Sequence, residues 1–158
     1  MSTVEVTAAT IRFAAMNLLA MREHSAKELI TKLSQKFDSD ERIVSVVERL
    51  TTDGLQSDFR FAEAFITVRK RQGKGPLLVT LELKERGVDS LLIEELVETN
   101  SVDWNRLALS AIQKKFGSSA SDRNLKEKAR HIRFLTSRGF SPTNIQYVFK
   151  YSRNAEDE

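Results

Sequence analysis

Residues 58–76, which read DFRFAEAFITVRKRQGKGP, decide how the chain divides into structural elements. Phe61 and Phe65 are one helical turn apart, so they share one face of a predicted helix. The basic run at residues 69–71 lies at the C-terminal end of this helix, where positive charge complements the helix dipole. The Gly-x-Gly sequence that follows interrupts the helix, and Pro76 suits the first position of the next one. Residue types alone favour a core helix with a solvated basic end over a binding site.

Helical periodicity recurs on both sides of this stretch. Residues 25–28 (SAKE) form a predicted capping box, and Asp58 is expected to cap the helix that it begins. The segment LKERGV at residues 83–88 is similar to LTSRGF at residues 135–140. The two segments are about 52 residues apart, an offset typical of helical repeat arrays.

The predicted fold is therefore all-α, without any sheet. It consists of three tandem three-helix repeats in an elongated, curved array. We expect the repeats at residues 1–56, 57–101 and 102–152, followed by a frayed acidic tail at residues 153–158. A repeat of this size cannot bury its apolar faces alone, so neighbouring repeats are expected to stack.

The composition indicates an intracellular, soluble protein. The chain has 158 residues, of which 41% are hydrophobic and 30% are charged, so a packed core is expected. It contains no cysteine, which excludes disulfides and thiol catalysis. No apolar run approaches the ~20 residues that span a bilayer, and residues 1–10 lack the basic start and apolar run of a signal peptide. We therefore predict a cytoplasmic location.

Charge is distributed unevenly, although the net charge is only +3. Residues 102–152 contain 10 basic and 3 acidic side chains, so this repeat carries +7. Each of the first two repeats contains 7 basic and 8 acidic side chains and carries −1. This asymmetry predicts an acidic or polyanionic partner for the last repeat.

The sequence contains no motif of a catalytic or metal site. It has no Walker phosphate-binding loop, nucleophile elbow or zinc-protease motif, and its two histidines have no metal-ligand spacing. His24 is interpreted as a turn residue, and His131 as part of a basic face. We therefore expect no enzymatic activity, no cofactor and no metal.

Two surfaces are candidates for binding. The first is basic, and phosphate binding and simple solubilisation explain it equally well. Its members are Arg69, Lys70, Arg71, Lys74, Lys114, Lys115, Arg123, Lys126, Lys128, Arg130 and Arg133. The second is apolar, because Leu77, Leu78 and Leu81 widen the apolar stripe of the helix that begins at Pro76. Such a helix is either buried or offers a contact patch, and burial is the favoured interpretation.

Ordered motifs along the chain resemble those of the RecX family of bacterial recombination regulators. The central signature consists of residues 58–62 (DFRFA), Phe65, Arg69, 74–76 (KGP), 82–83 (EL) and 87–88 (GV). The motif of the first repeat is similar to residues 19–25, 28–29 and 32–33, and that of the last is similar to residues 134–135 and 138–140. The similarity covers residues 11–150.

The resemblance implies a non-enzymatic, cytoplasmic modulator of the RecA recombinase, with a role in recombination, DNA repair and the SOS response. RecX proteins lodge in the helical groove of the RecA–DNA filament and inhibit filament growth, ATP hydrolysis and strand exchange. Some also bind DNA, so single- or double-stranded DNA is a second implied partner. The sequence departs from the family pattern where Leu78 and Thr80 replace basic residues. We expect a monomer that does not associate with membranes.

The leading hypothesis assigns recombinase or DNA contacts to the basic third repeat and to five cations of the second: Arg60, Arg69, Lys70, Arg71 and Lys74. Arg60 has an alternative role, in which it pairs with a carboxylate such as Glu63 and holds repeats together. The rival hypothesis is a helical nucleic-acid-binding module that acts through its third repeat without a recombinase. A third hypothesis is a scaffold in which the surface of Leu77, Leu78 and Leu81 pairs two copies.

Overall fold

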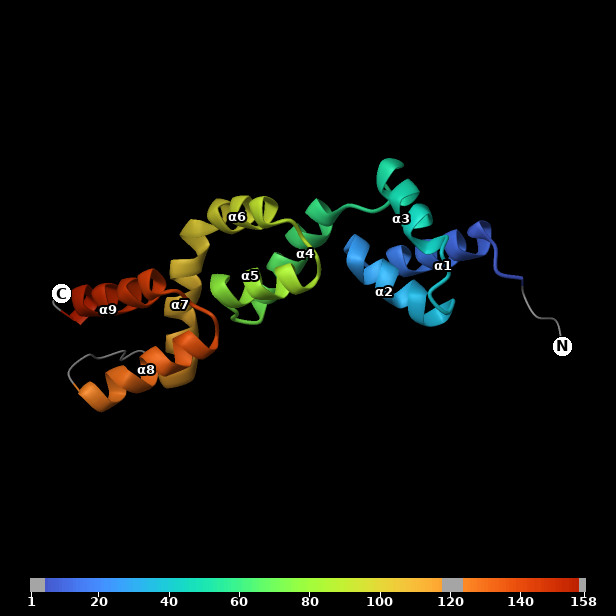
Figure 1. Ribbon diagram of the computed structural model, residues 1–158. Coiled ribbons are helices and arrows are strands. Elements are labelled where there is room, and N and C mark those ends of the chain that lie inside the picture. Colours follow the sequence, from blue (N-terminus) through green and yellow to red (C-terminus); the bar gives the residue numbers. More distant parts are fainter. Residues whose placement is uncertain (1–4, 118–123, 157–158) are drawn as a thin grey trace. The chain divides into compact units, whose positions relative to one another are not determined.

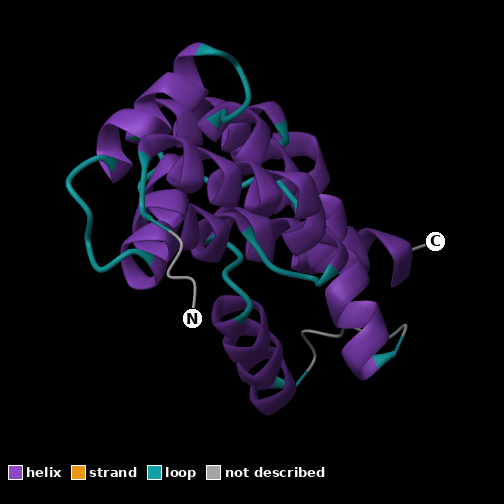
Figure 2. Ribbon diagram, turned by 90° about the vertical axis from the view of Figure 1, so that its right-hand side faces the viewer, coloured by secondary structure: helices purple, strands orange, loops and turns teal. Residues whose placement is uncertain are grey.

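The computed structural model describes residues 5–117 and 124–156, and all regular elements in these ranges are α-helices. Figure 2 shows helices and connecting loops only. In chain order the helices are α1 (Ala8–Met21), α2 (Ala26–Lys36), α3 (Ile43–Thr52), α4 (Asp58–Arg71), α5 (Pro76–Glu85), α6 (Ser90–Thr99), α7 (Ser101–Phe116), α8 (Leu125–Ser137) and α9 (Pro142–Glu156). The all-α prediction is confirmed, and the break after residue 71 lies where the glycines and Pro76 predict it.

Residue contacts divide the chain into two compact packing units. The first packing unit comprises Met1–Ala64 and Leu83–Asp89, and the second comprises Phe65–Glu82 and Ser90–Glu158. The division falls within α4 and α5, so both helices contribute residues to each packing unit.

The core of the first packing unit lies among α1, α2 and α3, which lie side by side in Figure 1. Each helix contributes an apolar stripe with helical spacing. Packing these stripes against one another removes apolar surface from water, which stabilises the fold. The buried side chains are Ile11, Ala14, Ala15, Leu29, Leu33, Ile43, Val46, Val47 and Leu50. The predicted capping box at residues 25–28 is confirmed, since Ser25 accepts a hydrogen bond from the Glu28 amide and Glu28 accepts one from the Ser25 amide.

Asp58 caps a helix other than its own. Its Oδ1 accepts hydrogen bonds from the backbone N–H of Ala26, at the start of α2, and from the side-chain amide of Gln56, both at 2.9 Å. The start of α4 is capped instead by Ser57, whose hydroxyl accepts a hydrogen bond from the Arg60 amide at 3.2 Å. The expectation that Asp58 caps α4 is therefore wrong. Ser57 already occupies the capping position, which leaves the Asp58 carboxylate free to satisfy donors of α2.

The core of the second packing unit is centred on α7, which packs against α8 and α9. The buried side chains of this core are Ala108, Ile112, Leu135, Phe140 and Val148. Trp104 is also buried, and its indole N–H donates to the carbonyl of Val97 at 2.9 Å, which attaches the start of α7 to α6.

A backbone contact between two glycine turns, here called the glycine clasp, fixes the start of α5 to the end of α8. The Gly75 N–H donates to the carbonyl of Arg138 at 2.7 Å, and the Leu77 N–H donates to the carbonyl of Gly139 at 2.9 Å. A Cβ on Gly75 would lie 2.5 Å from backbone atoms of Gly139 and Phe140, so only glycine permits this approach. The clasp joins two segments that are distant in sequence and brings the C-terminal turns of α4 and α8 together.

Two interpretations of side-chain placement are wrong. Leu77 and Leu81 are 56% and 54% exposed, so the favoured burial of the apolar face of α5 does not hold for them. His131 is 4% exposed and packs between the rings of Phe116 and Phe149, so it does not extend a basic face. None of the helices in residues 5–117 and 124–156 is long and apolar enough to cross a bilayer.

Candidate functional site

Arg60 has a structural role within the first packing unit. Its guanidinium donates to Glu23 at 3.0 Å and to the carbonyl of Gly54 at 2.8 Å, which ties the first turn of α4 to the segments after α1 and α3. Arg60 thus pairs with a carboxylate, that of Glu23, as the alternative role describes.

Arg69 and Lys70 are engaged by carboxylates inside the second packing unit. Arg69 pairs with Glu82 of α5 at 2.6 Å and lies over the ring of Phe65. This ion pair is largely withdrawn from solvent, because the two side chains are only 24% and 16% exposed. Arg69 therefore joins α4 to α5 within this packing unit.

Lys70 makes the corresponding connection between α4 and α7. Its ammonium donates to Asp103 at 2.8 Å and also to Asn100, and it lies over the ring of Trp104. The hydrogen bond from Lys70, and next the one from Arg106, lowers the pKa of the Asp103 carboxyl. Both residues at the start of the predicted basic run thus have intramolecular partners.

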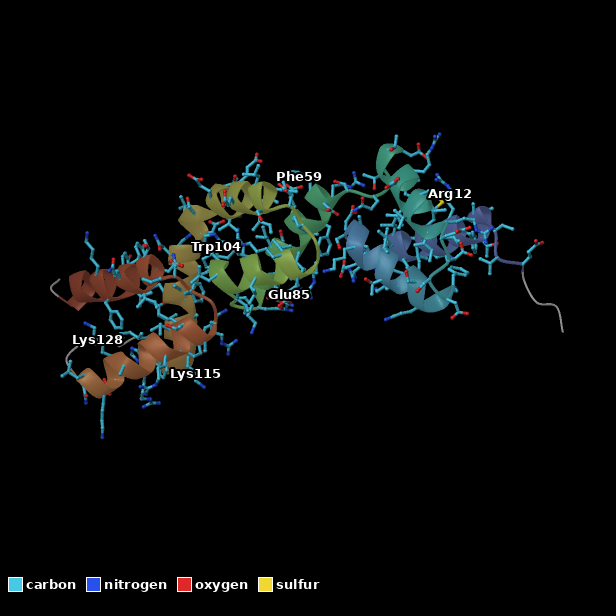
Figure 3. All side chains as sticks on the ribbon, in the orientation of Figure 1. Arg12, Phe59, Glu85, Trp104, Lys115 and Lys128 are labelled. Carbon is cyan, nitrogen blue, oxygen red and sulfur yellow. The ribbon has the colours of Figure 1, made fainter. Side chains whose placement is uncertain are left out.

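Arg71 differs from its two neighbours because it lines a cleft rich in cations, here called the basic cleft. The cleft has a volume of about 260 Å³ and is formed by the C-terminal ends of α4, α7 and α8. Its lining residues are Arg71, Gln72, Gly73, Ala111, Lys114, Lys115, Phe134 and Arg138. Figure 3 shows Lys115 on the part of α7 that α8 crosses. The structure therefore brings together three predicted site residues from two repeats: Arg71, Lys114 and Lys115.

The four cations of the basic cleft have no ion-pair partner among the described residues. Arg71, Lys114 and Lys115 are exposed, while Arg138 is half-buried and lies over the ring of Phe134 with its guanidinium carbon 5.2 Å from the ring centroid. No carboxylate lies among the described residues that line the cleft. This is the arrangement expected of a surface that accepts an anionic group from outside the chain.

Other predicted basic residues lie outside the cleft. Lys126, Arg130 and Arg133 are exposed on α8, and Lys128 near its N-terminal end lies over Phe149, away from Lys115 (Figure 3). Lys74 is half-buried and does not line the cleft. Arg123 lies outside the described residues.

Arg138 was not predicted as a site residue. The sequence places it in the Arg-Gly-Phe motif of the last repeat, where it is read as the end of a helix. Its place beside Arg71 depends on the glycine clasp, because the carbonyl of Arg138 is the acceptor for Gly75. The matching Arg86-Gly87 motif of the second repeat was the one signal that a cation recurs at this position.

The two histidines are internal. The Nδ1–H of His24 donates to the carbonyl of Arg22, and its Nε2 accepts from the Lys32 ammonium, both at 3.0 Å. Burial lowers the pKa of both His24 and His131, so both rings favour the neutral form. No group of three or more potential metal ligands occurs within the described part of the chain.

The fold and the cleft define an all-α protein of short helices with a cation-lined cleft. Comparison with known families gives three matches, in order along the chain: the first RecX three-helix domain at residues 12–50, the second at residues 57–97 and the third at residues 103–149. The prediction of three tandem three-helix repeats is confirmed by these matches.

Similar proteins agree with this assignment. The chain is 38% identical over 152 residues to the regulatory protein RecX of Chromohalobacter salexigens, covering 96% of this chain and 97% of the relative. It is 40% identical over 136 residues to the regulatory protein RecX of Legionella pneumophila, covering 86% and 90%. The crystal structure of RecX from Lactobacillus salivarius has the same fold, with a TM-score of 0.80 at 21% identity over 92% of this chain and 96% of that one. The chain belongs to the RecX family, a family of non-catalytic regulatory proteins.

Proposed function

We propose that this RecX family protein regulates the RecA recombinase. It binds the RecA–DNA filament in its helical groove and inhibits filament extension, ATP hydrolysis and strand exchange, so that it modulates recombination and DNA repair in the cytoplasm. The observation that carries this proposal is the ordered match to all three RecX domains over residues 12–149.

The basic cleft is the surface proposed to contact the filament. Its four cations lack carboxylate partners among the described residues, so binding an anionic partner does not require an existing ion pair to break. Arg69 and Lys70 are disfavoured as contacts for the opposite reason. Breaking the Arg69–Glu82 pair would leave a largely desolvated charge without a partner, which is costly.

The proposal is tested by titrating the protein into RecA on single-stranded DNA and measuring ATP hydrolysis and strand exchange. We expect both activities to fall at substoichiometric protein. The double variant Arg71→Glu/Lys115→Glu should inhibit much less, whereas Lys126→Glu/Arg133→Glu should retain most of the inhibition. The second variant is a matched control, because it makes the same charge change at exposed positions of α8 that lie outside the cleft. Unchanged ATP hydrolysis and strand exchange at equimolar wild-type protein would refute the proposal.

A further inference from the structure

We propose that two copies of this chain pair, with the acidic face of α6 in each copy docked on the basic cleft of the other. The acidic face is the outer side of α6, formed by Leu91, Glu94, Glu95 and Glu98. This goes beyond the proposed function, which concerns only the contact between the cleft and the filament. It also limits the expectation of a monomer to dilute protein or high salt.

The acidic face lies opposite the side of α6 that packs into the protein. Residues three or four positions apart share one side of a helix, so the three glutamates lie on the same side as Leu91. All three glutamates are exposed, and Leu91 is 74% exposed. The buried residues Ile93 and Leu96 lie on the opposite side of α6. The whole face is therefore accessible to a partner.

The negative charge of the acidic face is not neutralised within the described part of the chain. None of its three glutamates forms an ion pair with a described residue. Glu94 and Glu98 are four residues apart, and a like-charge pair at this spacing destabilises a helix. Glu98 also lies in the last turn of α6, where a carboxylate opposes the helix dipole and no basic residue offsets it. Cations from another molecule would relieve both unfavourable interactions.

The basic cleft carries the complementary charge. Its lining contains four cations without an ion pair to a described residue, and no carboxylate lies among the described lining residues. Docking of α6 would bring three carboxylates to these four cations, so most of the charge on both surfaces would be compensated. The cleft also has two apolar lining residues, Ala111 and Phe134, against which the exposed Leu91 can pack.

The acidic face of one chain cannot reach its own cleft, so the partner must be a second copy. α6 packs at the start of α7, whereas the cleft includes the end of α7, where Figure 3 shows Lys115. The residues from Ser101 to Lys114 span about 20 Å of this helix. Two α7 helices placed antiparallel bring the start of each beside the end of the other. Both contacts then form together around a two-fold axis.

The test measures self-association of the full chain by analytical ultracentrifugation over a concentration series. Wild-type protein should form dimers at about 0.05 M salt and dissociate at about 1 M salt, where the Debye length falls to about 3 Å. A wild type that stays monomeric at low salt would overturn the proposal and leave the cleft to the filament alone. Association that persists at high salt would also overturn it, since an apolar contact would then hold the copies together. Oligomers larger than dimers would overturn the reciprocal arrangement.

Two charge-reversal variants test the two surfaces separately. Glu95→Lys/Glu98→Lys changes the acidic face and leaves the cleft intact, whereas Arg71→Glu/Lys115→Glu changes the cleft and leaves the acidic face intact. Each exposed ion pair strengthens an association by up to about fivefold, so losing two pairs should weaken each contact by up to about 25-fold. Glu95→Gln/Glu98→Gln, which removes the charges without adding opposite ones, should also lose dimers. Wild-type dimerisation in any of these variants would contradict the proposal.

An equal mixture of the two charge-reversal variants provides the most specific measurement. In the mixed pair one contact is entirely wild type, and the other places the new lysines against the new glutamates. Heterodimers should therefore form although neither variant dimerises alone. If the mixture stays monomeric under conditions in which the wild type dimerises, the acidic face and the cleft are not partners.

The matched control is Lys126→Glu/Arg133→Glu, which makes the same charge change as the cleft variant at exposed positions of α8 outside the cleft. It should dimerise nearly as well as the wild type, and an equal loss would show that association follows net charge instead. Pairing withholds the cleft from the filament at high protein concentration, a consequence that rests on the proposed function. Because no recombinase is present in the ultracentrifuge, failure of pairing is distinct from failure of RecA inhibition, which is measured separately by ATP hydrolysis.

Discussion

Replacing Gly75 with alanine tests whether the glycine clasp fixes the second packing unit. An added Cβ would lie 2.5 Å from the backbone carbon of Gly139 and the backbone nitrogen of Phe140. These are backbone atoms and cannot rotate away as the end of a side chain would. The turns must therefore separate, and two hydrogen bonds lengthen or break: Gly75 N–H to Arg138 and Leu77 N–H to Gly139.

The expected loss follows from these contacts. Each hydrogen bond contributes about 1 kcal/mol net, and forcing atoms into a packed contact costs about 1–3 kcal/mol, partly relieved as the bonds lengthen. We therefore expect Gly75→Ala to reduce the free energy of unfolding by about 2–4 kcal/mol.

Gly73→Ala provides a control two residues away. Gly73 has φ +75° but open space where a Cβ would lie, so alanine there meets only the cost of a left-handed backbone, about 1–2 kcal/mol. Gly75 shows the reverse combination, with a steric overlap and no positive φ. The pair thus separates steric exclusion from backbone conformation.

The measurement is urea unfolding followed by circular dichroism at 222 nm for the wild type and both variants. Gly139→Ala should also be severe, because Gly139 has φ +93° and its added Cβ would overlap Leu78. Its effect should be less than additive with that of Gly75→Ala, since both break the same contact. If Gly75→Ala proved no more destabilising than Gly73→Ala, the close backbone approach would not be a determinant of stability.

Three further predictions concern polar groups. Asp58→Ala should cost about 1–2 kcal/mol in urea unfolding, because the Ala26 N–H at the start of α2 loses its acceptor while the Ser25–Glu28 capping box remains, and Ser57→Ala should cost about 1 kcal/mol. His131→Phe should reduce the loss of stability that occurs as the pH falls below 6.5. Burial lowers the pKa of His131 in the folded protein, so below pH 6.5 the unfolded chain binds more protons than the folded one. The pKa of His24 is lowered in the same way, so His24 should still contribute its own part of this loss in the variant. Asp103→Asn should remove stability that is present above the usual pKa of 3.8 and lost as pH falls below it, which unfolding curves between pH 2 and pH 5 would detect.

Local features of this fold could be predicted because they depend on neighbouring residues. The break at residues 73–76 depends on glycine and proline conformations, and the capping box of Ser25 on a spacing of three residues. The amphipathic stripes of α1, α2 and α3 have a helical period that identifies their buried faces, such as Leu29 and Leu33 on α2.

Features that depend on tertiary packing could not be predicted in this way. Asp58 is a residue type that commonly caps the helix that it begins. Its carboxylate instead accepts a hydrogen bond from the N–H of Ala26, because the start of α2 lies beside it. His131 belongs to a basic run in sequence, yet the side of α8 on which it lies faces Phe116 and Phe149. Arg138 lines the basic cleft only because the turns at Gly75 and Gly139 contact each other. The sequence of either turn alone does not indicate this contact, since the two turns are distant in sequence.

The residues that carry the family resemblance largely bind one another in this chain. Arg69 pairs with Glu82, and the Gly75 N–H donates to the carbonyl of Arg138, so four signature positions are used in two internal contacts. A surface for a partner must then consist of side chains that these internal contacts hold in place but that do not take part in them. Lys114 and Lys115 meet this requirement, since both lie outside the signature motifs and line the basic cleft without an ion pair to a described residue. It follows that changes in the signature should act mainly through stability, whereas changes in Lys114 and Lys115 should weaken binding and leave the free energy of unfolding nearly unchanged.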